Sequence, residues 1–103
     1  MSIMRYTTND AIKFLKSINL NISRELFDIN DLTYGLNVEA EHGSRDALTN
    51  VTNDNLIITG KIALAHLREF PDYYKRLKVL ETNAELYWKN RSRKRECRYK
   101  LIK

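Results

Sequence analysis

The N-terminal part of the chain places apolar residues at helical spacing. After Thr7 and Thr8, the apolar positions recur three or four residues apart, at Ala11, Phe14, Leu15 and Ile18. A threonine before the stripe can cap a helix, and Asp10 falls in its first turn, so the pattern predicts a capped amphipathic helix of about three turns. Residues 19–23 are expected to form a connection, and residues 24–27 a short turn of helix.

A second helical stripe follows, with apolar positions at Ile29, Leu32, Leu36 and Ala40. Asp28 or Asn30 is suited to cap its start, and Gly43 is expected to end it, because glycine is common just past a helix C-terminus. Stepping 100° per residue places Glu39 on the semi-buried flank. Glu41 falls on the opposite, water-facing side, together with Tyr34 and Asn37.

Gly35 lies inside this second helix, one turn before Glu39. Glycine costs a helix interior about 1 kcal/mol relative to alanine. A close neighbour at this point would explain why the sequence carries glycine here.

Residues 43–55 are the longest segment without a periodic pattern. The Thr, Asn and Asp side chains in it can bond the backbone locally, so we expect a long ordered loop. Asn53, Asp54 or Asn55 is then expected to cap a third helix over residues 56–69. This helix places His66 in the middle of its core-facing side.

Pro71 follows that helix and is well suited to the start of a fourth, with Asp72 favouring its positive end. The fourth helix has the most regular stripe of the chain, which is most simply read as core: Tyr73, Leu77, Leu80, Ala84 and Tyr87. With only three glycines and one proline in 103 residues, an all-β fold is disfavoured. We predict an all-α fold, a compact bundle of about four helices with a long ordered loop between helices 2 and 3.

Charge divides the chain into a helical domain over residues 1–88 and a basic C-terminal tail or helix extension over residues 89–103. From Trp88 onward, eight basic residues and one acidic residue give +7, whereas ten basic and twelve acidic residues before it give −2. The candidate nucleic-acid-binding residues are Lys89, Arg91, Arg93, Lys94, Arg95, Arg98 and Lys100. With Trp88 and Tyr99 they are suited to neutralising phosphates and stacking bases. Docking of an acidic protein and a solvated end without a specific role remain the alternatives.

The two histidines each lie three residues from a glutamate, in Glu39-Ala-Glu-His42 and His66-Leu-Arg-Glu69. On a helix this spacing brings both side chains of a pair to one face. Two such pairs on facing helices are typical of a divalent-metal site, and mixed nitrogen and oxygen ligation suits Zn, Fe or Mn. Glu39, His42, His66 and Glu69 are therefore the candidate metal ligands, for a metal-binding protein or a small metal-dependent hydrolase.

The alternative interpretation of the same residues is a buried hydrogen-bond network without a cofactor. In it His66 bonds Glu39 or the 49–54 loop, and His42 lies at the C-terminal end of the second helix, where a cation suits the helix dipole. Acid–base catalysis with His66 as the base is a third interpretation. No glycine-rich phosphate loop is present, and Cys97 has no histidine near it in sequence, so an enzyme is the minority interpretation.

The single cysteine excludes an internal disulfide, which fits a reducing compartment. Neither a signal peptide nor an apolar run long enough for a membrane span is visible in the sequence. We expect an intracellular, cytoplasmic protein that does not enter a membrane.

Three stretches between Phe27 and Leu77 resemble an uncharacterised family of small proteins, a domain of unknown function found in bacteria, phages and large DNA viruses. They are GLNVEAEHG, TNVTND and TGKIALAHLREFPDYY. The resemblance implies no activity. It implies that the Glu/His pairs belong to the family pattern, together with a structural polar cluster that includes Glu41, Thr49, Asn50, Asp54, Asp72 and Tyr73. Ala40 stands where the family usually has leucine, and the basic tail lies outside the resemblance.

The sequence therefore favours a non-enzymatic binding or structural protein, with a phage or virus as the expected setting and the host cytoplasm or the virion as its location. A conformationally important Glu/His cluster and a basic tail that contacts nucleic acid or an acidic partner are its expected features. If the fourth helix extends beyond the others, its distal part with Leu86 and Trp88 is expected to pair with a second copy of the chain.

Overall fold

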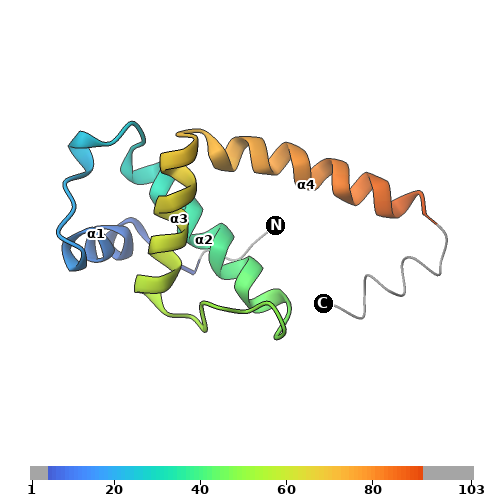
Figure 1. Cartoon of the computed structure of the whole chain (residues 1–103), viewed down its shortest axis with the longest axis horizontal. Helices are drawn as coiled ribbons and strands as arrows, with labels where there is room; N and C mark the ends of the chain where they lie inside the picture. The colour runs from blue at the N-terminus through green and yellow to red at the C-terminus, as the bar shows by residue number, and fades with distance from the viewer. Residues whose placement is uncertain (1–4, 92–103) are drawn as a thin grey trace.

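The computed structural model describes residues 5–91, and this part of the chain contains four α-helices and no β-strand (Figure 1). The elements in order are α1 (Thr8–Ser17), a short 3₁₀ helix η1 (Ile22–Arg24), α2 (Ile29–Arg45), α3 (Leu56–Glu69) and α4 (Tyr73–Lys89). The prediction of an all-α bundle of four helices is confirmed. The short helical turn lies at η1, a few residues before the position expected for it.

Reciprocal capping boxes begin both α1 and α2. The Thr7 hydroxyl accepts a hydrogen bond from the Asp10 backbone N–H at 3.3 Å, and the Asp10 carboxylate accepts one from the Thr7 N–H at 2.9 Å. Asp28 and Asp31 make the same exchange at 2.9 and 3.0 Å. Each box satisfies two backbone donors that a helix start otherwise leaves unpaired, so the chain enters both helices at fixed points.

The core lies where α1, α2 and α3 meet. Phe14, Leu32, Leu36 and Leu67 are almost fully buried there. Gly60 of α3 lets the Phe14 ring approach the helix backbone, since a Cβ atom at position 60 would lie 2.3 Å from the ring. The contact between α1 and α3 therefore depends on the absence of a side chain at this position.

Gly43 does not end α2, contrary to the sequence-based expectation; the helix continues to Arg45 and no glycine of the described chain has a positive φ. The reason for the glycine is space rather than backbone conformation. A Cβ atom at position 43 would lie 2.4 Å from the Thr52 hydroxyl oxygen, because the loop after α2 folds back against the helix.

Asn37 is only 4% exposed, although its helical position predicted a water-facing side chain. The segment before α1 covers it. The Asn37 side-chain oxygen accepts hydrogen bonds from the backbone N–H groups of Arg5 and Tyr6 at 2.6 and 2.7 Å, and its amide donates to the Tyr6 carbonyl at 2.9 Å. These hydrogen bonds join the N-terminal segment to α2.

The loop between α2 and α3 is held by its own side chains, as predicted. The Asn50 side-chain oxygen accepts from the backbone N–H groups of Thr52 and Asn53 at 3.1 and 3.0 Å. Asn53 and Asp54 then adopt positive φ angles of 47° and 61°, which asparagine and aspartate tolerate better than most residues. Asn55 caps α3 by accepting from the Ile58 N–H at 3.0 Å.

Helix α4 lies largely outside the core and extends away from the other helices (Figure 1). Tyr74 is its one buried residue. The stripe predicted as core is therefore wrong for its second half, because Leu80 is 63% exposed and Tyr87 is 45% exposed, and Ala84 is exposed as well. Only Tyr73 and Leu77 pack partly against the core. The three-helix body ends before the stripe does.

Within residues 5–91, every helix is too short or too polar to pass through a lipid bilayer. Residues 92–103 lie outside the described part, so the boundary between a domain over 1–88 and a tail over 89–103 stays a prediction.

We expect Gly60→Ala to lower the free energy of unfolding by about 1–3 kcal/mol, because overpacking against the Phe14 ring outweighs the better helix propensity of alanine. Urea denaturation followed by circular dichroism measures the change. In a Phe14→Leu background the cost of Gly60→Ala should fall, since the ring that causes the clash is gone. An unchanged or increased stability of Gly60→Ala would contradict this account of the α1–α3 contact.

Candidate functional site

The polar centre of the molecule is the contact between Glu39 of α2 and Tyr74 of α4. The Tyr74 hydroxyl donates a hydrogen bond of 2.8 Å to a Glu39 carboxylate oxygen, and both residues are buried, at 4% and 8% exposure. Gly35, one turn before Glu39, makes room for the ring, since a Cβ atom there would lie 2.6 Å from Tyr74. The close neighbour expected at Gly35 is thus Tyr74.

His66 of α3 lies beside this pair without a direct hydrogen bond to it. Its Nε2 atom is 3.6 Å from the same Glu39 oxygen, within ion-pair distance but beyond the range of a hydrogen bond. The imidazole stacks on the Tyr73 ring with centroids 4.1 Å apart and planes 8° from parallel. The His66 side chain is 32% exposed, so it lies at the edge of the core rather than in its middle, where the sequence placed it.

His42 pairs with a different carboxylate. Its Nε2 atom lies 2.5 Å from a Glu81 carboxylate oxygen of α4, and the two side chains are 33% and 42% exposed. The expectation that His42 interacts mainly with the C-terminal end of its own helix therefore misses this contact. The pair is a second connection between α2 and α4, beyond Tyr74.

The four predicted metal ligands do not form one site. Glu39 and His66 meet, His42 turns to Glu81, and Glu69 is exposed at the end of α3. Across residues 5–91, no three His, Cys, Asp or Glu side chains gather closely enough to hold a single metal ion. The expected meeting of both Glu/His pairs in one polar core is wrong, because His42 pairs with Glu81 of α4 and Glu69 is exposed.

The predicted structural polar cluster is likewise distributed over the molecule. Glu41 is exposed, Thr49 bonds the Asp46 carbonyl through its hydroxyl at 3.3 Å, and Asn50 organises the loop around itself. The loop is joined to the N-terminal segment through an ion pair between Asp54 and Arg5. Thr49 and Asn50 act within the loop, whereas Asp54 connects the loop to the N-terminal segment.

The last two members of the cluster lie where α3 turns into α4. Asp72 pairs with Arg76 one turn later at 2.8 Å, and this hydrogen bond holds the pKa of the Asp72 carboxyl below its usual value. Asp72 makes no side-chain bond to the backbone at the start of α4, so it acts there through charge rather than as a hydrogen-bonding cap. Tyr73 contributes its ring to the stack on His66.

Burial raises the pKa of the Tyr74 hydroxyl well above its ordinary value, and the neighbouring Glu39 charge acts in the same direction. The pKa of Tyr73 is also raised, by burial first and by the Glu39 charge second. Both hydroxyls therefore stay protonated at neutral pH. Tyr74 acts as a fixed donor to a buried carboxylate, an arrangement that stabilises the helix junction.

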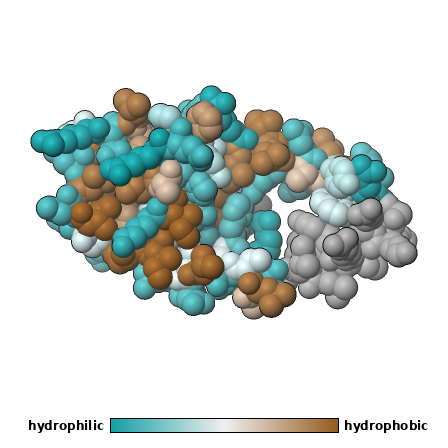
Figure 2. All heavy atoms as spheres, in the orientation of Figure 1, coloured by the Kyte–Doolittle hydropathy of each residue, from teal (hydrophilic) through white to brown (hydrophobic). Residues whose placement is uncertain are grey.

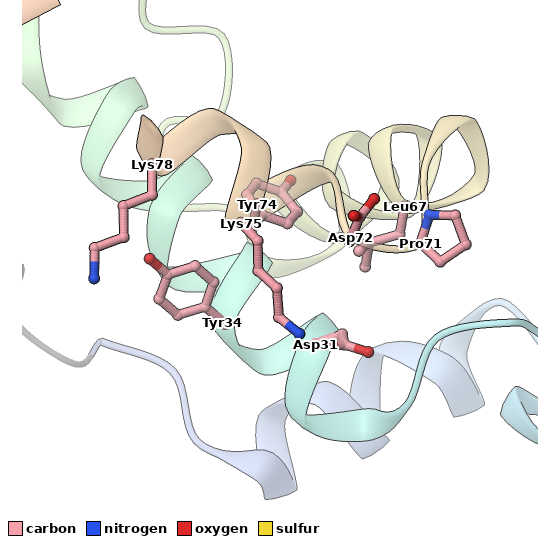
Figure 3. A pocket seen from close by; sticks show the side chains of 8 residues that line it. All are labelled: Asp31, Tyr34, Leu67, Pro71, Asp72, Tyr74, Lys75 and Lys78. Atoms are coloured by element: carbon pink, nitrogen blue, oxygen red, sulfur yellow. The ribbon is translucent and has the colours of Figure 1, made fainter. Parts of the chain in front are cut away.

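A pocket of about 270 Å³ opens on the other side of Tyr74 (Figure 3). Its walls and rim are formed by Asp31, Tyr34, Leu67, Pro71, Asp72, Tyr74, Lys75 and Lys78. In Figure 3 the Lys75 amine reaches toward Asp31, across the mouth of the pocket. The lining includes two acids, Asp31 and Asp72, and two lysines, Lys75 and Lys78, so no single sign of charge marks the pocket for one class of ligand.

At the far end of α4 the first residues of the basic segment come together with aromatic rings. The Arg91 guanidinium lies 3.9 Å from the centroid of the Tyr87 ring, and Trp88 meets Tyr87 edge to face with centroids 5.1 Å apart. Lys89 is the last residue of the helix. The other predicted nucleic-acid contacts lie outside the described residues: Arg93, Lys94, Arg95, Arg98 and Lys100.

Tyr74 and Glu81 are the site residues that the sequence reasoning missed. The signal for Tyr74 was Gly35, which implied a close neighbour without identifying it. Glu81 directly follows Leu80 of the apolar stripe, and nothing in this local sequence indicates that it pairs with His42. Both depend on how α4 crosses α2, which the sequence pattern does not determine.

The fold and these contacts define a small helical protein in which polar side chains join α2, α3 and α4 at the base of the projecting α4. The chain belongs to the family described as "Protein of unknown function (DUF5661)", whose model matches residues 11–83. No curated protein and no solved structure matches the chain.

We expect the stability of the protein to fall as pH rises above about 10, and Tyr74→Phe to lose less of it over that range. The folded-state pKa of Tyr74 lies above its unfolded value of 10.0, so its contribution is complete below pH 10 and lost as the unfolded state ionises. Chemical denaturation between pH 7 and pH 11 measures this, with Tyr34→Phe on the exposed neighbouring ring as the matched control.

At neutral pH, Tyr74→Phe should cost about 1–3 kcal/mol, because the buried Glu39 carboxylate loses its hydrogen-bond donor. If Tyr74→Phe, Tyr34→Phe and the unchanged protein all lose the same free energy of unfolding between pH 7 and pH 11, ionisation of Tyr74 does not cause the alkaline loss of stability.

Proposed function

We propose that this protein is a non-enzymatic nucleic-acid-binding protein, in which the helical body supports a basic segment at the tip of α4. The observation that carries the proposal is the separation of charge along the chain: +7 from Trp88 onward and −2 before it. Because α4 extends away from the other helices, the segment begins at a distance from their core (Figure 1).

The residues at the tip match the chemistry of such an interface. Lys89 and Arg91 supply cations, and Tyr87 and Trp88 supply aromatic faces directly beside them. Cations neutralise phosphates and release counterions, whereas aromatic rings stack on bases without regard to sequence. We therefore expect salt-dependent binding with little sequence preference, and single-stranded nucleic acid to bind at least as well as a duplex.

The family match ends at residue 83, before the tip of α4. Nucleic-acid binding is accordingly proposed for this chain and not for the family. An occurrence in a phage or virus, in the virion or in the host cytoplasm, stays a prediction from composition.

We expect replacement of Arg93, Lys94 and Arg95 by glutamine to weaken binding to a 20-nucleotide single strand and to reduce the salt dependence of log Kd by about 2, since each lost phosphate contact on a single strand removes about 0.7 from the slope. Fluorescence anisotropy over a series of salt concentrations measures both. The matched control replaces Lys13, Lys16 and Lys61, three exposed cations of the body, and changes the net charge equally.

If the tail and body variants lose affinity equally, binding follows net charge and the assignment to the tip is wrong. If the full chain binds a polyglutamate peptide as tightly as the nucleic acid at equal salt, an acidic protein is the better partner. The only tryptophan, Trp88, reports independently, because its fluorescence should be quenched when bases stack at the tip.

A further inference from the structure

Helix α4 carries an apolar strip that the described body covers only at one end. The strip consists of Tyr73, Leu77, Leu80, Ala84 and Tyr87, which follow one another at spacings of four and three residues. The first two are partly buried, whereas the last three are exposed. Figure 2 shows hydrophobic atoms at the surface along the middle of α4. A helix end without packing is marginal in water, so a partner for this strip would stabilise it.

We propose that the strip binds the same strip of a second copy of this chain, with the two α4 helices antiparallel and a two-fold axis at Leu80. The strip is complementary to its own reverse. Tyr73 and Tyr87 each lie seven residues from Leu80, so reversal places them opposite one another. Leu77, three residues before Leu80, then lies within about one residue's rise of the partner's small Ala84, which is four residues after it, and Leu80 faces itself, as a two-fold interface requires.

A hollow at the body end of the strip gives this register an anchor. It measures about 160 Å³ and is lined by Phe70, Tyr73, Arg76, Leu77 and Leu80. The partner's Tyr87 arrives opposite Tyr73 and is therefore in position to fill it. Large aromatic side chains that enter pockets commonly dominate interface energies. The same contact would cover Phe70, which is 46% exposed.

Charge selects the antiparallel orientation. A parallel pair would place two segments of +7 side by side. In the antiparallel pair, the basic end of each α4 lies beside the partner's corner between α3 and α4. This corner carries both signs of charge, because Glu69 and Asp72 lie beside Arg68 and Arg76. The two basic ends are then kept apart, at opposite ends of the interface.

The pairing does not depend on nucleic-acid binding, but it bears on it. Helix α4 has 17 residues and so is about 25 Å long, and an antiparallel pair places the two basic segments at opposite ends of that length. A dimer would contact one nucleic acid at two points, which raises apparent affinity without a new kind of contact.

The test compares the oligomeric state of the full chain with that of two variants, by light scattering after size exclusion and by sedimentation over a concentration series. Leu80→Glu places two carboxylates at the proposed axis. Val79→Glu is the matched control, because Val79 is 62% exposed against 63% for Leu80 but points about 100° away from the strip. Neither substitution disturbs the core.

We expect the unchanged protein and Val79→Glu to dimerise alike, and Leu80→Glu to raise the dimer dissociation constant by about 100-fold or more, since a buried unpaired charge is strongly unfavourable. A full chain that stays monomeric at the highest concentrations would overturn the proposal. So would equal dissociation of both variants, because the interface would then lie elsewhere.

Cysteine cross-linking in a Cys97→Ser background tests the orientation. A disulfide needs Cα atoms within about 7 Å. In the antiparallel pair, Ala84→Cys should cross-link with Leu77→Cys in a mixture of the two variants but not with itself, because two copies of residue 84 lie about 12 Å apart along the axis. Cross-linking of Ala84→Cys alone would show a parallel pair and overturn the proposed register.

The two proposals fail separately. Leu80→Glu leaves all cations in place, so a monomeric variant should still bind nucleic acid at low salt, with reduced apparent affinity. If the tail variant loses nucleic-acid binding but still dimerises, both assignments are supported. If the unchanged chain dimerises but does not bind nucleic acid, only the nucleic-acid function is refuted.

Discussion

The direction of α4 depends on the way Tyr74 fits against α2. Its ring occupies the space that Gly35 leaves open, and its hydroxyl satisfies the buried Glu39 carboxylate. A buried carboxylate without a donor is costly, so the junction is stable only when Tyr74 sits there. His66 and Tyr73 then stack at the margin of the same contact. The second connection, between His42 and Glu81, is partly exposed and contributes less, since exposed ion pairs are weakly stabilising.

Local sequence patterns predict most of the fold because local interactions decide it. The apolar stripes of α1, α2 and α3 and the caps at Thr7, Asp28 and Asn55 all act within a few residues. The expectations that are wrong depend on distant neighbours. Gly43 is required by the returning loop at Thr52, and Asn37 is buried by the segment before α1. Neither contact can be inferred from the sequence of the helix that carries the residue.

Only part of the candidate site could be predicted from the sequence, because the remaining contacts depend on residues that are distant in sequence. Helical spacing correctly identified Glu39 and His66 as side chains that meet across an interhelical contact. It could not show that α4 would bring Tyr74 to Glu39 and Glu81 to His42, because the angle between α2 and α4 follows from the packing of one aromatic ring. His42 pairs with Glu81 of α4, whereas His66 lies beside Glu39, so the two histidines have different partners. The arrangement joins α2, α3 and α4.

The regular stripe of α4 has the pattern of a core helix, yet half of it lies beyond the body. The pattern records where apolar residues lie on the helix and not what covers them. Beyond Glu81 the strip residues Ala84 and Tyr87 are exposed, so the core does not support the last turns of α4. Lys89 in the last turn suits the helix dipole, but that effect is small and screened by salt. Any partner that binds only the helical form, whether a second α4 or a nucleic acid at its tip, stabilises these turns by mass action. Order at the end of α4 and binding there are therefore coupled, and each is expected to strengthen the other.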